Sequence, residues 1–469
     1  MEKTELVFIP FPGKGHLVSM IQLAKQFVDR DDRFSATILG IKSPFESASD
    51  SNNSPPIDAS NPSIRYFDVK PLDPPSSETS RENYRKHYME SHNSPIKDII
   101  TNHVLTKPVS FAGLVVDLFC TSMIDVAEEL GVPSYVFFTS GAAFLGFMFY
   151  HLSRHEQDGV TEFNESDPES NISSYTNQVP ARVFPSLTLN KQGFAACVNI
   201  TRGMKKSKGI IVNSLQEMES HAIASFRDGE TPPVYPVGPL LDLNAKNPDQ
   251  TQRDKIVTWL DHQPIKSVVF LCFGSHGSFS APQLREIAIG LEKSGKRFLW
   301  SVRKAQQEGR PPGDFTNDEL VEILPEGFLE RTKEKGMLCG WAPQVEVLAH
   351  KATGGFVSHC GWNSTLESLW FGVPLVTWPL YAEQQLNAFQ MVRELGLAVE
   401  LRLDSRTDGG DVVIADEIEK AVIRVMEDDC EVRERVEEMR EKLRRGVGKG
   451  GSSFKSFGRL IEDILTNIS

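Results

Sequence analysis

Apolar runs separated by short polar clusters recur along most of the chain. Leu6–Pro10, Phe111–Cys120 and Gly354–Ser358 are almost wholly apolar, which is typical of strands that are buried on both faces of a parallel sheet. Polar turns follow such runs, and then come segments whose apolar residues have helical spacing, such as Leu17 to about Asp29. The repeated order of strand, turn and helix predicts an α/β protein, whose ligands bind at the carboxyl ends of the strands.

The repeats form two sets, because a polar segment without periodicity, residues 242–254, interrupts them. Such a segment is typical of an interdomain linker. We therefore expect two Rossmann-like β/α/β domains, residues 1–241 and 255–450, that face a cleft. Residues 451–469 have the apolar spacing of one amphipathic helix. A chain of 469 residues, 40% of them hydrophobic, is long enough for two separate cores.

The segment Trp341–Gln384 combines predicted strands with polar clusters that a simple core would not contain. One strand ends just before His359, and Asn363 and Ser364 open the next helix, where backbone N–H groups suit an anion such as a pyrophosphate. Glu367 lies one helical turn beyond Asn363 and points to the same side. Its carboxylate can accept hydrogen bonds from two ribose hydroxyls.

Other side chains of this segment fit a nucleotide that carries a sugar. Trp341 offers a flat face on which a base can stack. Glu383 and Gln384 follow a second predicted strand, Val373–Trp378, and supply acceptors and donors for the hydroxyls of a hexose. The residues alone therefore predict a site for an anionic nucleotide sugar.

A histidine and an aspartate lie at strand ends in the first half of the chain. The turn Phe11–Gly15 leads to His16 at the mouth of a helix, where a ligand-binding role and an ordinary capping role are equally open. Asp117 ends a buried strand and needs a partner in apolar surroundings. That partner is either the His16 imidazole or the N-terminus of the next helix, and spacing alone favours the helix. Thr139 also ends a strand, where an N-cap and a ligand contact are compatible.

Three further motifs resemble ligand sites but break the required patterns. The dinucleotide fingerprint needs a glycine where Val18 stands, and Gly290–Lys296 resembles a phosphate loop but precedes a strand and lacks the final hydroxyl residue. Asp29 and Asp31 have the spacing of a metal-binding pair but lie in a charged helix end. The six cysteines contain no CxxC pair and are expected to be buried free thiols. We therefore expect neither a nicotinamide oxidoreductase nor a metal site.

Charge and hydropathy limit the partners. A net charge of −13 argues against nucleic acid and anionic membranes. Val132–Tyr150 carries no charge over a length that suggests a membrane helix, but Pro133 and the break at Thr139–Gly141 favour a buried strand followed by a buried helix. The chain enters its first strand without a signal peptide, so a cytoplasmic protein is expected.

The segment Trp341–Gln384 resembles the signature of the plant family 1 UDP-dependent glycosyltransferases, which glycosylate small secondary metabolites. It matches that signature at WAPQ, HCGWNS and AEQ, without gaps. The similarity extends from PFPGKGH near the N-terminus to GGSS before the last helix. It implies the GT-B fold, with the donor bound mainly by the second domain and the acceptor by the first. It also implies that the final helix, residues 451–469, packs back on the first domain.

The resemblance also assigns roles to the matching positions. It implies that His16 is the general base and that Asp117 supports it. A glutamine at the position of Gln384 usually accompanies glucose in this family. The implied donor contacts are Trp341 and the Ala342 backbone on uracil, Gln344 and Glu367 on ribose, Ser275, His359, Asn363 and Ser364 on the phosphates, Trp362, Glu383 and Gln384 on the sugar, and Thr139 on sugar or phosphate.

We therefore expect a monomeric, inverting glucosyltransferase that moves glucose from UDP-glucose to a hydroxyl of a small lipophilic metabolite, without a metal or another cofactor. Overall similarity favours a flavonoid or other phenolic aglycone, and a triterpenoid or other terpenoid aglycone is the alternative. The acceptor is expected to contact the segments Pro44–Lys86 and His155–Ala196. A non-catalytic UDP-sugar-binding protein would also use the donor motif, but the presence of both His16 and Asp117 counts against it.

Overall fold

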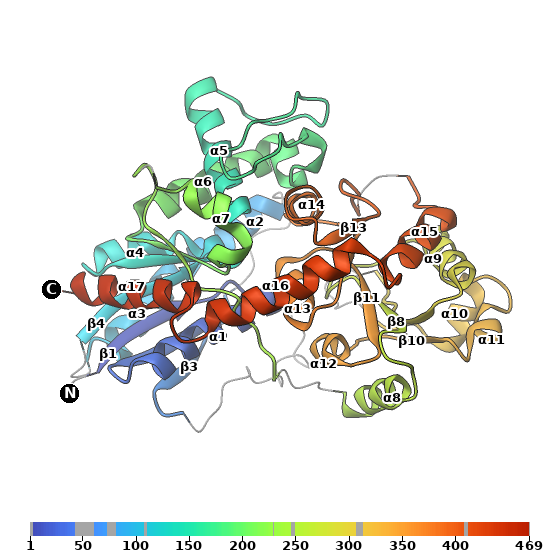
Figure 1. The fold of residues 1–469 in the computed structure, drawn as a ribbon. Helices are drawn as coiled ribbons and strands as arrows, with labels where there is room; N and C mark the ends of the chain where they lie inside the picture. Colours follow the sequence, from blue (N-terminus) through green and yellow to red (C-terminus); the bar gives the residue numbers. More distant parts are fainter. Residues whose placement is uncertain are drawn as a thin grey trace. The chain divides into compact units, whose positions relative to one another are not determined.

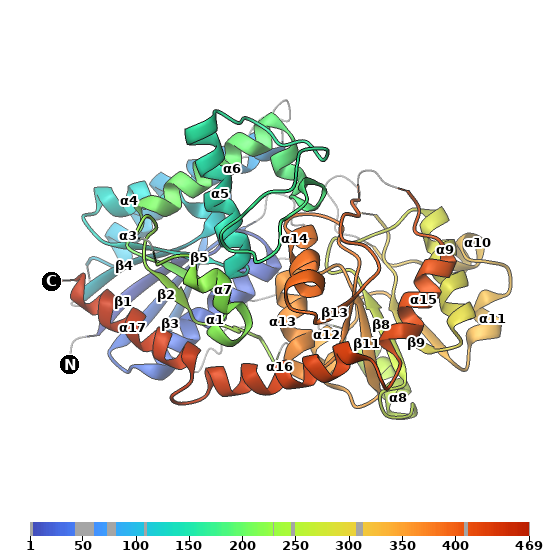
Figure 2. The same cartoon turned by 45° about the horizontal axis from the view of Figure 1, so that its top comes forward.

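The described residues form two compact units, each with its own parallel sheet (Figure 1 and Figure 2). This confirms the predicted α/β class with two sets of repeats. The N-terminal unit comprises residues 1–181, 186–242 and 445–469, and the C-terminal unit comprises residues 182–185 and 243–444. The computed structural model describes residues 3–42, 61–72, 81–106, 110–227, 229–244, 249–305, 313–407 and 411–468.

The N-terminal unit contains a seven-stranded sheet in the order β3-β2-β1-β4-β5-β6-β7. Adjacent strands pair in parallel, so their carboxyl ends lie at one edge. The central strands β1, β2, β4 and β5 are buried almost throughout, which explains their unbroken apolar runs. The strands are β1 (Thr4–Ile9), β2 (Phe34–Ile41), β3 (Ile64–Val69), β4 (Ser110–Asp117), β5 (Ser134–Phe138), β6 (Ile210–Val212) and β7 (Val234–Pro236).

The first helix of this unit begins earlier than its apolar pattern predicts. The pattern starts at Leu17, but α1 starts at Lys14, because Gly13 takes the extended conformation of an N-cap residue (φ −145°, ψ 134°). His16 therefore lies inside the first turn of α1. The helices of this unit are α1 (Lys14–Arg30), α2 (Arg81–Ser91), α3 (Asn93–His103), α4 (Met123–Glu129), α5 (Ala142–Asp158), α6 (Lys191–Lys206), α7 (Gln216–Ala224) and α17 (Ser452–Thr466).

The uncharged stretch 132–150 divides into a strand and a helix, as predicted. It contains β5 and the first part of α5, and Gly141 is the extended N-cap residue between them. Nowhere in the described ranges is there a helix long and apolar enough to cross a bilayer.

The last helix, α17, packs into the core of the N-terminal unit. Phe457, Leu460 and Ile464 are fully buried in the same hydrophobic cluster as Phe27 of α1. The guanidinium carbon of Arg30 lies 4.7 Å from the centre of the Phe457 ring. The predicted return of the C-terminal helix to the first set of repeats is therefore confirmed.

The C-terminal unit contains a six-stranded sheet in the order β10-β9-β8-β11-β12-β13, again with parallel pairs. Its core includes the buried rings of Trp300 and Trp378. The strands are β8 (Val268–Cys272), β9 (Arg297–Ser301), β10 (Gly336–Cys339), β11 (Thr353–Ser358), β12 (Leu375–Thr377) and β13 (Ala398–Glu400). The helices are α8 (Gln250–Asp261), α9 (Ala281–Ser294), α10 (Asn317–Ile323), α11 (Phe328–Thr332), α12 (Gln344–Ala349), α13 (Trp362–Phe371), α14 (Gln384–Phe389), α15 (Ala415–Val425) and α16 (Glu431–Val447), which begins in this unit.

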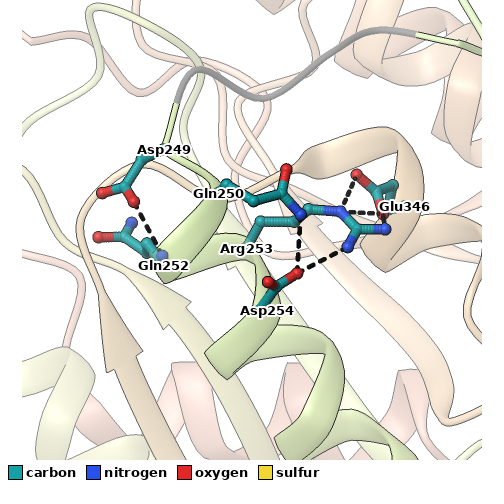
Figure 3. Close-up of polar contacts among 6 residues, drawn as sticks. All are labelled: Asp249, Gln250, Gln252, Arg253, Asp254 and Glu346. Carbon is teal, nitrogen blue, oxygen red and sulfur yellow. Dashed lines mark hydrogen bonds and ion pairs between the residues drawn. The ribbon is translucent and has the colours of Figure 1, made fainter.

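Helix α8 begins inside the segment 242–254, which the sequence presents as an unstructured linker. The Asp249 carboxylate accepts a hydrogen bond of 2.9 Å from the Gln252 backbone and caps the helix (Figure 3). Gln250 then donates to Asp254 one turn later, at 2.9 Å. The polar first turn of α8 hides its helical periodicity in the sequence.

In both sheets the order of strands reverses beside the first strand of the unit, between β1 and β4 and between β8 and β11. Open α/β sheets bind ligands at such a reversal, beyond the carboxyl ends of the strands. The residues at or just beyond those ends include His16, Asp117 and Thr139 in the N-terminal unit, and Ser275, Trp341, His359 and Glu383 in the C-terminal unit.

Candidate active site

His16 and Asp117 are directly bonded in the N-terminal unit. The Nδ1 atom of His16 lies 2.8 Å from Oδ2 of Asp117. The Asp117 side chain is fully buried, whereas 26% of the His16 side chain is exposed. The other carboxylate oxygen, Oδ1, accepts the Phe119 N–H at 3.0 Å, so Asp117 also caps the short helix Leu118–Cys120. Each carboxylate oxygen of Asp117 therefore binds one of the two partners that the sequence predicts, the His16 imidazole and the N-terminus of the next helix.

The position of the carboxylate fixes the chemistry of the imidazole. A neutral histidine carries its proton on one ring nitrogen, and a carboxylate at Nδ1 favours the tautomer with the proton there. The lone pair is then on Nε2, which can accept a proton. If the ring gains that proton, the buried Asp117 carboxylate stabilises the positive charge. The arrangement suits a general base.

Two aromatic rings flank this base. The rings of Phe11 and Phe119 lie 5.5 and 5.4 Å from the His16 ring, centre to centre, and 5.1 Å from each other. Thr139 adds a hydroxyl, whose Oγ1 lies 3.3 Å from Nδ1 of His16. The partly exposed imidazole therefore has two aromatic rings beside it and, from the end of β5, the Thr139 hydroxyl.

Glu219 is a buried residue near this group that sequence reasoning missed. Its carboxylate is 3% exposed and accepts the backbone N–H groups of Ala142 and Ala143, each at 2.8 Å. These are the first residues of α5, which follows directly from the turn at Thr139. The N-terminus of α5 is thus neutralised by the chain itself. The QEMES stretch in which Glu219 lies looks like the solvated face of a helix and gives no signal of this contact.

In the C-terminal unit, a glutamine joins the starts of two helices. Nε2 of Gln344, the first residue of α12, donates to Ser364 Oγ at 2.8 Å and to Glu367 Oε2 at 2.7 Å, both on α13. The predicted ribose-binding residues Gln344 and Glu367 are therefore neighbours. Trp362 and Ser364 are buried. The N-cap residue of α13 is Gly361, which has no side chain with which to cap the helix.

His359 lies in a tight slot between two glycine turns. A Cβ atom added at Gly274 or at Gly361 would lie 2.6 Å from its Nε2, so only glycine fits at either side. Burial lowers the pKa of His359 to about 4, against the opposing effect of a hydrogen bond at the Cys272 backbone. The ring is therefore neutral near neutral pH. Its Nδ1 is buried, and no group in the described part of the chain forms a hydrogen bond with it.

Trp341 is anchored through its backbone. Its carbonyl oxygen accepts a hydrogen bond from Gln252 Nε2 of α8. The next residue of α8, Arg253, binds Glu346 of α12 through Nε, with distances of 2.9 and 2.8 Å (Figure 3). Ala342 is 6% exposed and follows Trp341 in the same turn. Helix α8 thus contacts the turn between β10 and α12 at Trp341 and contacts α12 itself at Glu346.

Gln384 is buried, and its oxygen is already used. Oε1 accepts the N–H groups of Leu380 at 2.9 Å and Tyr381 at 3.0 Å and so closes the turn before α14. The oxygen is therefore not available to a sugar, and Gln384 can bind a sugar hydroxyl only as a donor, through its amide nitrogen. Glu383 is half-buried at the N-cap position of α14.

Ser275 follows Gly274, whose positive φ of 73° makes the turn after β8. The neighbouring His276 is exposed, as expected for a surface loop residue. Within the described ranges, no three His, Cys, Asp or Glu side chains come together as a metal site would require. Of the acceptor segments, 44–60 and 73–80 lie outside the described residues.

Comparisons with known proteins agree on one kind of protein. The family model "UDP-glucoronosyl and UDP-glucosyl transferase" matches residues 206–432. The chain is 54% identical to UDP-glycosyltransferase 71K1 of Malus domestica over 99% of both chains. It is 46% identical to UDP-glucose flavonoid 3-O-glucosyltransferase 6 of Fragaria ananassa, also over 99% of each. The crystal structure of Medicago truncatula UGT71G1 with UDP-glucose has a TM-score of 0.89, with 46% identity over 98% of both chains.

Proposed function

Because the chain belongs to the plant family 1 UDP-glycosyltransferases, hexosyltransferases of the GT-B fold that act on small plant metabolites, we propose that it transfers glucose from UDP-glucose to a phenolic hydroxyl with inversion. The observation that carries this proposal is the bonded pair of His16 and Asp117, at 2.8 Å. It supplies a base beside an aromatic wall, as a phenol acceptor requires.

The proposed reaction begins at the acceptor hydroxyl. Nε2 of His16 takes the hydroxyl proton while the acceptor oxygen attacks the anomeric carbon of glucose. The bond between that carbon and the UDP oxygen breaks on the opposite face, so the α-linked donor yields a β-linked product. Asp117 stabilises the imidazolium that forms, since it holds the Nδ1 proton. General-base catalysis of this kind contributes roughly 10²–10⁴-fold.

The proposed donor site uses the C-terminal unit. Gln344 and Glu367 are bonded to each other and can grip one ribose together. We place a neutral His359 beside the phosphates, where it adds no charge that the chain would have to neutralise. The complete proposed set is Trp341 and the Ala342 backbone for uracil, Gln344 and Glu367 for ribose, Ser275, His359, Asn363 and Ser364 for the phosphates, Trp362, Glu383 and Gln384 for glucose, and Thr139 from the N-terminal unit for sugar or phosphate.

Glucose and a flavonoid or other phenolic are the proposed substrates. One relative with a solved structure carries UDP-glucose, and relatives from Fragaria ananassa are named as flavonoid glucosyltransferases. Phe11 and Phe119 beside His16 favour a flat aromatic acceptor, which can stack on their rings. A triterpenoid has no aromatic face and would gain only apolar contact from them.

A substrate panel tests the proposal. The protein is incubated with UDP-glucose and, separately, with flavonols, simple phenols and triterpene alcohols, and products are sought as a hexose mass increment. We expect products with the phenolic acceptors and β configuration at the new bond. Transfer to triterpenes alone would refute the acceptor assignment, and an α-linked product would refute inversion. His16→Ala should lose transfer and keep UDP binding, whereas the exposed His221→Ala should behave as wild type.

A further inference from the structure

One arginine joins two of the turns that the proposed donor site uses. In the order of strands, β9 lies between β10 and β8. Arg303 lies just beyond the end of β9, whereas Ser275 follows β8 and Trp341 follows β10. The chain at Arg303 is pinned by an isolated antiparallel bridge to Asp314. A side chain at this point can therefore reach the turns on both sides.

Arg303 makes both contacts. Its Nη1 donates to the Ser275 carbonyl oxygen at 3.1 Å. Its guanidinium carbon lies 5.1 Å from the centre of the Trp341 ring, over the ring face. A guanidinium at that distance over an indole ring is held by a cation–π attraction.

The Arg303 side chain is largely shielded from solvent. The Arg303 side chain is 12% exposed, and the Asp314 carboxylate that faces it, 52% exposed, lies 3.9 Å from its Nε. That distance is longer than a hydrogen bond. Burial lowers the pKa of Arg303, against the opposing effect of Asp314. A buried arginine is costly to keep for packing alone, because an apolar residue would fill the same space without losing hydration.

We propose that Arg303 is a positioning residue for the nucleotide: it holds the Trp341 ring in place for the base and ties the Ser275 turn to that ring. This inference rests on the proposed function, in which Trp341 stacks on uracil. Holding the ring before the ligand arrives removes an ordering cost from binding. The proposed base, His16, belongs to the other unit, so we expect the effect on donor binding and not on the chemical step.

The test compares UDP with uridine, which has the base and ribose but no phosphate. Arg303→Met keeps the length and apolar contact of the side chain but loses its charge, plane and hydrogen bond. We expect the Kd of uridine to rise roughly tenfold and the Kd of UDP to rise by at least the same factor, because the Ser275 turn is proposed to contact the phosphates. The KM for UDP-glucose should rise by a similar factor, with kcat at saturating donor close to that of wild type. Arg303→Lys restores the charge without the plane and should recover only part of the loss.

Each other outcome has a defined meaning. A loss confined to UDP, which grows at low salt, would mean that Arg303 serves the phosphates directly and would overturn the positioning role. Uridine binding as tight as in wild type would also overturn it. If wild-type protein binds neither ligand, the proposed function fails first, and the inference fails with it. Arg285→Met, an exposed arginine of α9, is the matched control, and circular dichroism with thermal melting checks that all variants fold.

Discussion

The buried Glu219 cap on helix α5 predicts how much stability is lost when the cap is removed. In wild type, the Glu219 carboxylate accepts the backbone N–H groups of Ala142 and Ala143, both at 2.8 Å, while it is 3% exposed. Glu219→Ala removes both hydrogen bonds and leaves two buried donors without their acceptor. Hydrogen bonds to charged groups contribute about 1.5–3 kcal/mol each. Taking the low end for both, because water can enter the vacated space, the expected loss is about 3 kcal/mol.

The expected loss is large enough to measure by thermal unfolding. For a unit of this size, each kcal/mol lowers the Tm by about 2–4 °C, so Glu219→Ala should lower the transition of the N-terminal unit by roughly 6–12 °C. Glu219→Gln keeps one acceptor oxygen but turns an amide N–H₂ towards the second backbone donor. We expect its Tm to fall between those of wild type and the alanine variant. Glu156→Ala, which breaks an exposed ion pair of 3.0 Å with Arg202, is the matched control and should stay close to wild type.

Glu219→Ala should also affect the chemical step without affecting donor binding. The α5 N-terminus follows the turn at Thr139, whose hydroxyl lies 3.3 Å from His16 Nδ1. Well below its Tm, Glu219→Ala should therefore lose kcat, whereas its Kd for UDP should be unchanged, since the proposed donor residues are mainly in the other unit. If its Tm falls no further than that of Glu156→Ala, the two hydrogen bonds do not hold α5, and this reasoning is wrong.

Three further predictions concern the dyad, a buried histidine and metal dependence. Asp117→Asn should keep the cap on Phe119 but lower kcat by about 10²-fold or more, since the amide no longer stabilises the imidazolium; unchanged kcat would exclude the dyad. His151 is fully buried, neither of its ring nitrogens has a hydrogen-bond partner among the described residues, and burial lowers its pKa to about 3. Between its ordinary value of 6.5 and about 3, only the unfolded chain gains that proton, so stability falls as pH falls, by about 1.4 kcal/mol per pH unit. His151→Phe should flatten the dependence of Tm on pH in that window, and equal slopes in both proteins would contradict this. EDTA should leave the transfer rate unchanged, and a large drop that Mg²⁺ or Mn²⁺ reverses would show that a metal is needed.

The parts of the fold that the sequence predicts are those that burial alone determines. Strands buried on both faces need apolar residues at every position, so β1, β4 and β11 are visible as unbroken runs. Their carboxyl ends then locate His16, Asp117 and His359 without any knowledge of packing. Helix starts are less visible, because the N-cap geometry of Gly13 and Asp249 decides them.

Contacts between distant elements are not visible in the sequence. Glu219 and Arg303 each meet partners that only the tertiary fold brings near. Gln384 matches the signature of the family, but the use of its oxygen by the turn at Leu380 and Tyr381 depends on backbone geometry. Asp117 is the instructive case. The sequence poses its two partners as alternatives, although a carboxylate has two oxygens and can serve both.

The two helix starts explain how an acidic chain can select where an anion binds. With a net charge of −13, the overall field repels a nucleotide diphosphate, so attraction must come from local dipoles. Helix α5 starts at a strand end in the N-terminal unit, but Glu219 neutralises its first N–H groups and excludes a second anion. Helix α13 starts at a strand end in the C-terminal unit with no N-cap side chain. In the proposed function the phosphates therefore bind at the start of α13, and not at the start of α5, where the chain's own carboxylate already binds.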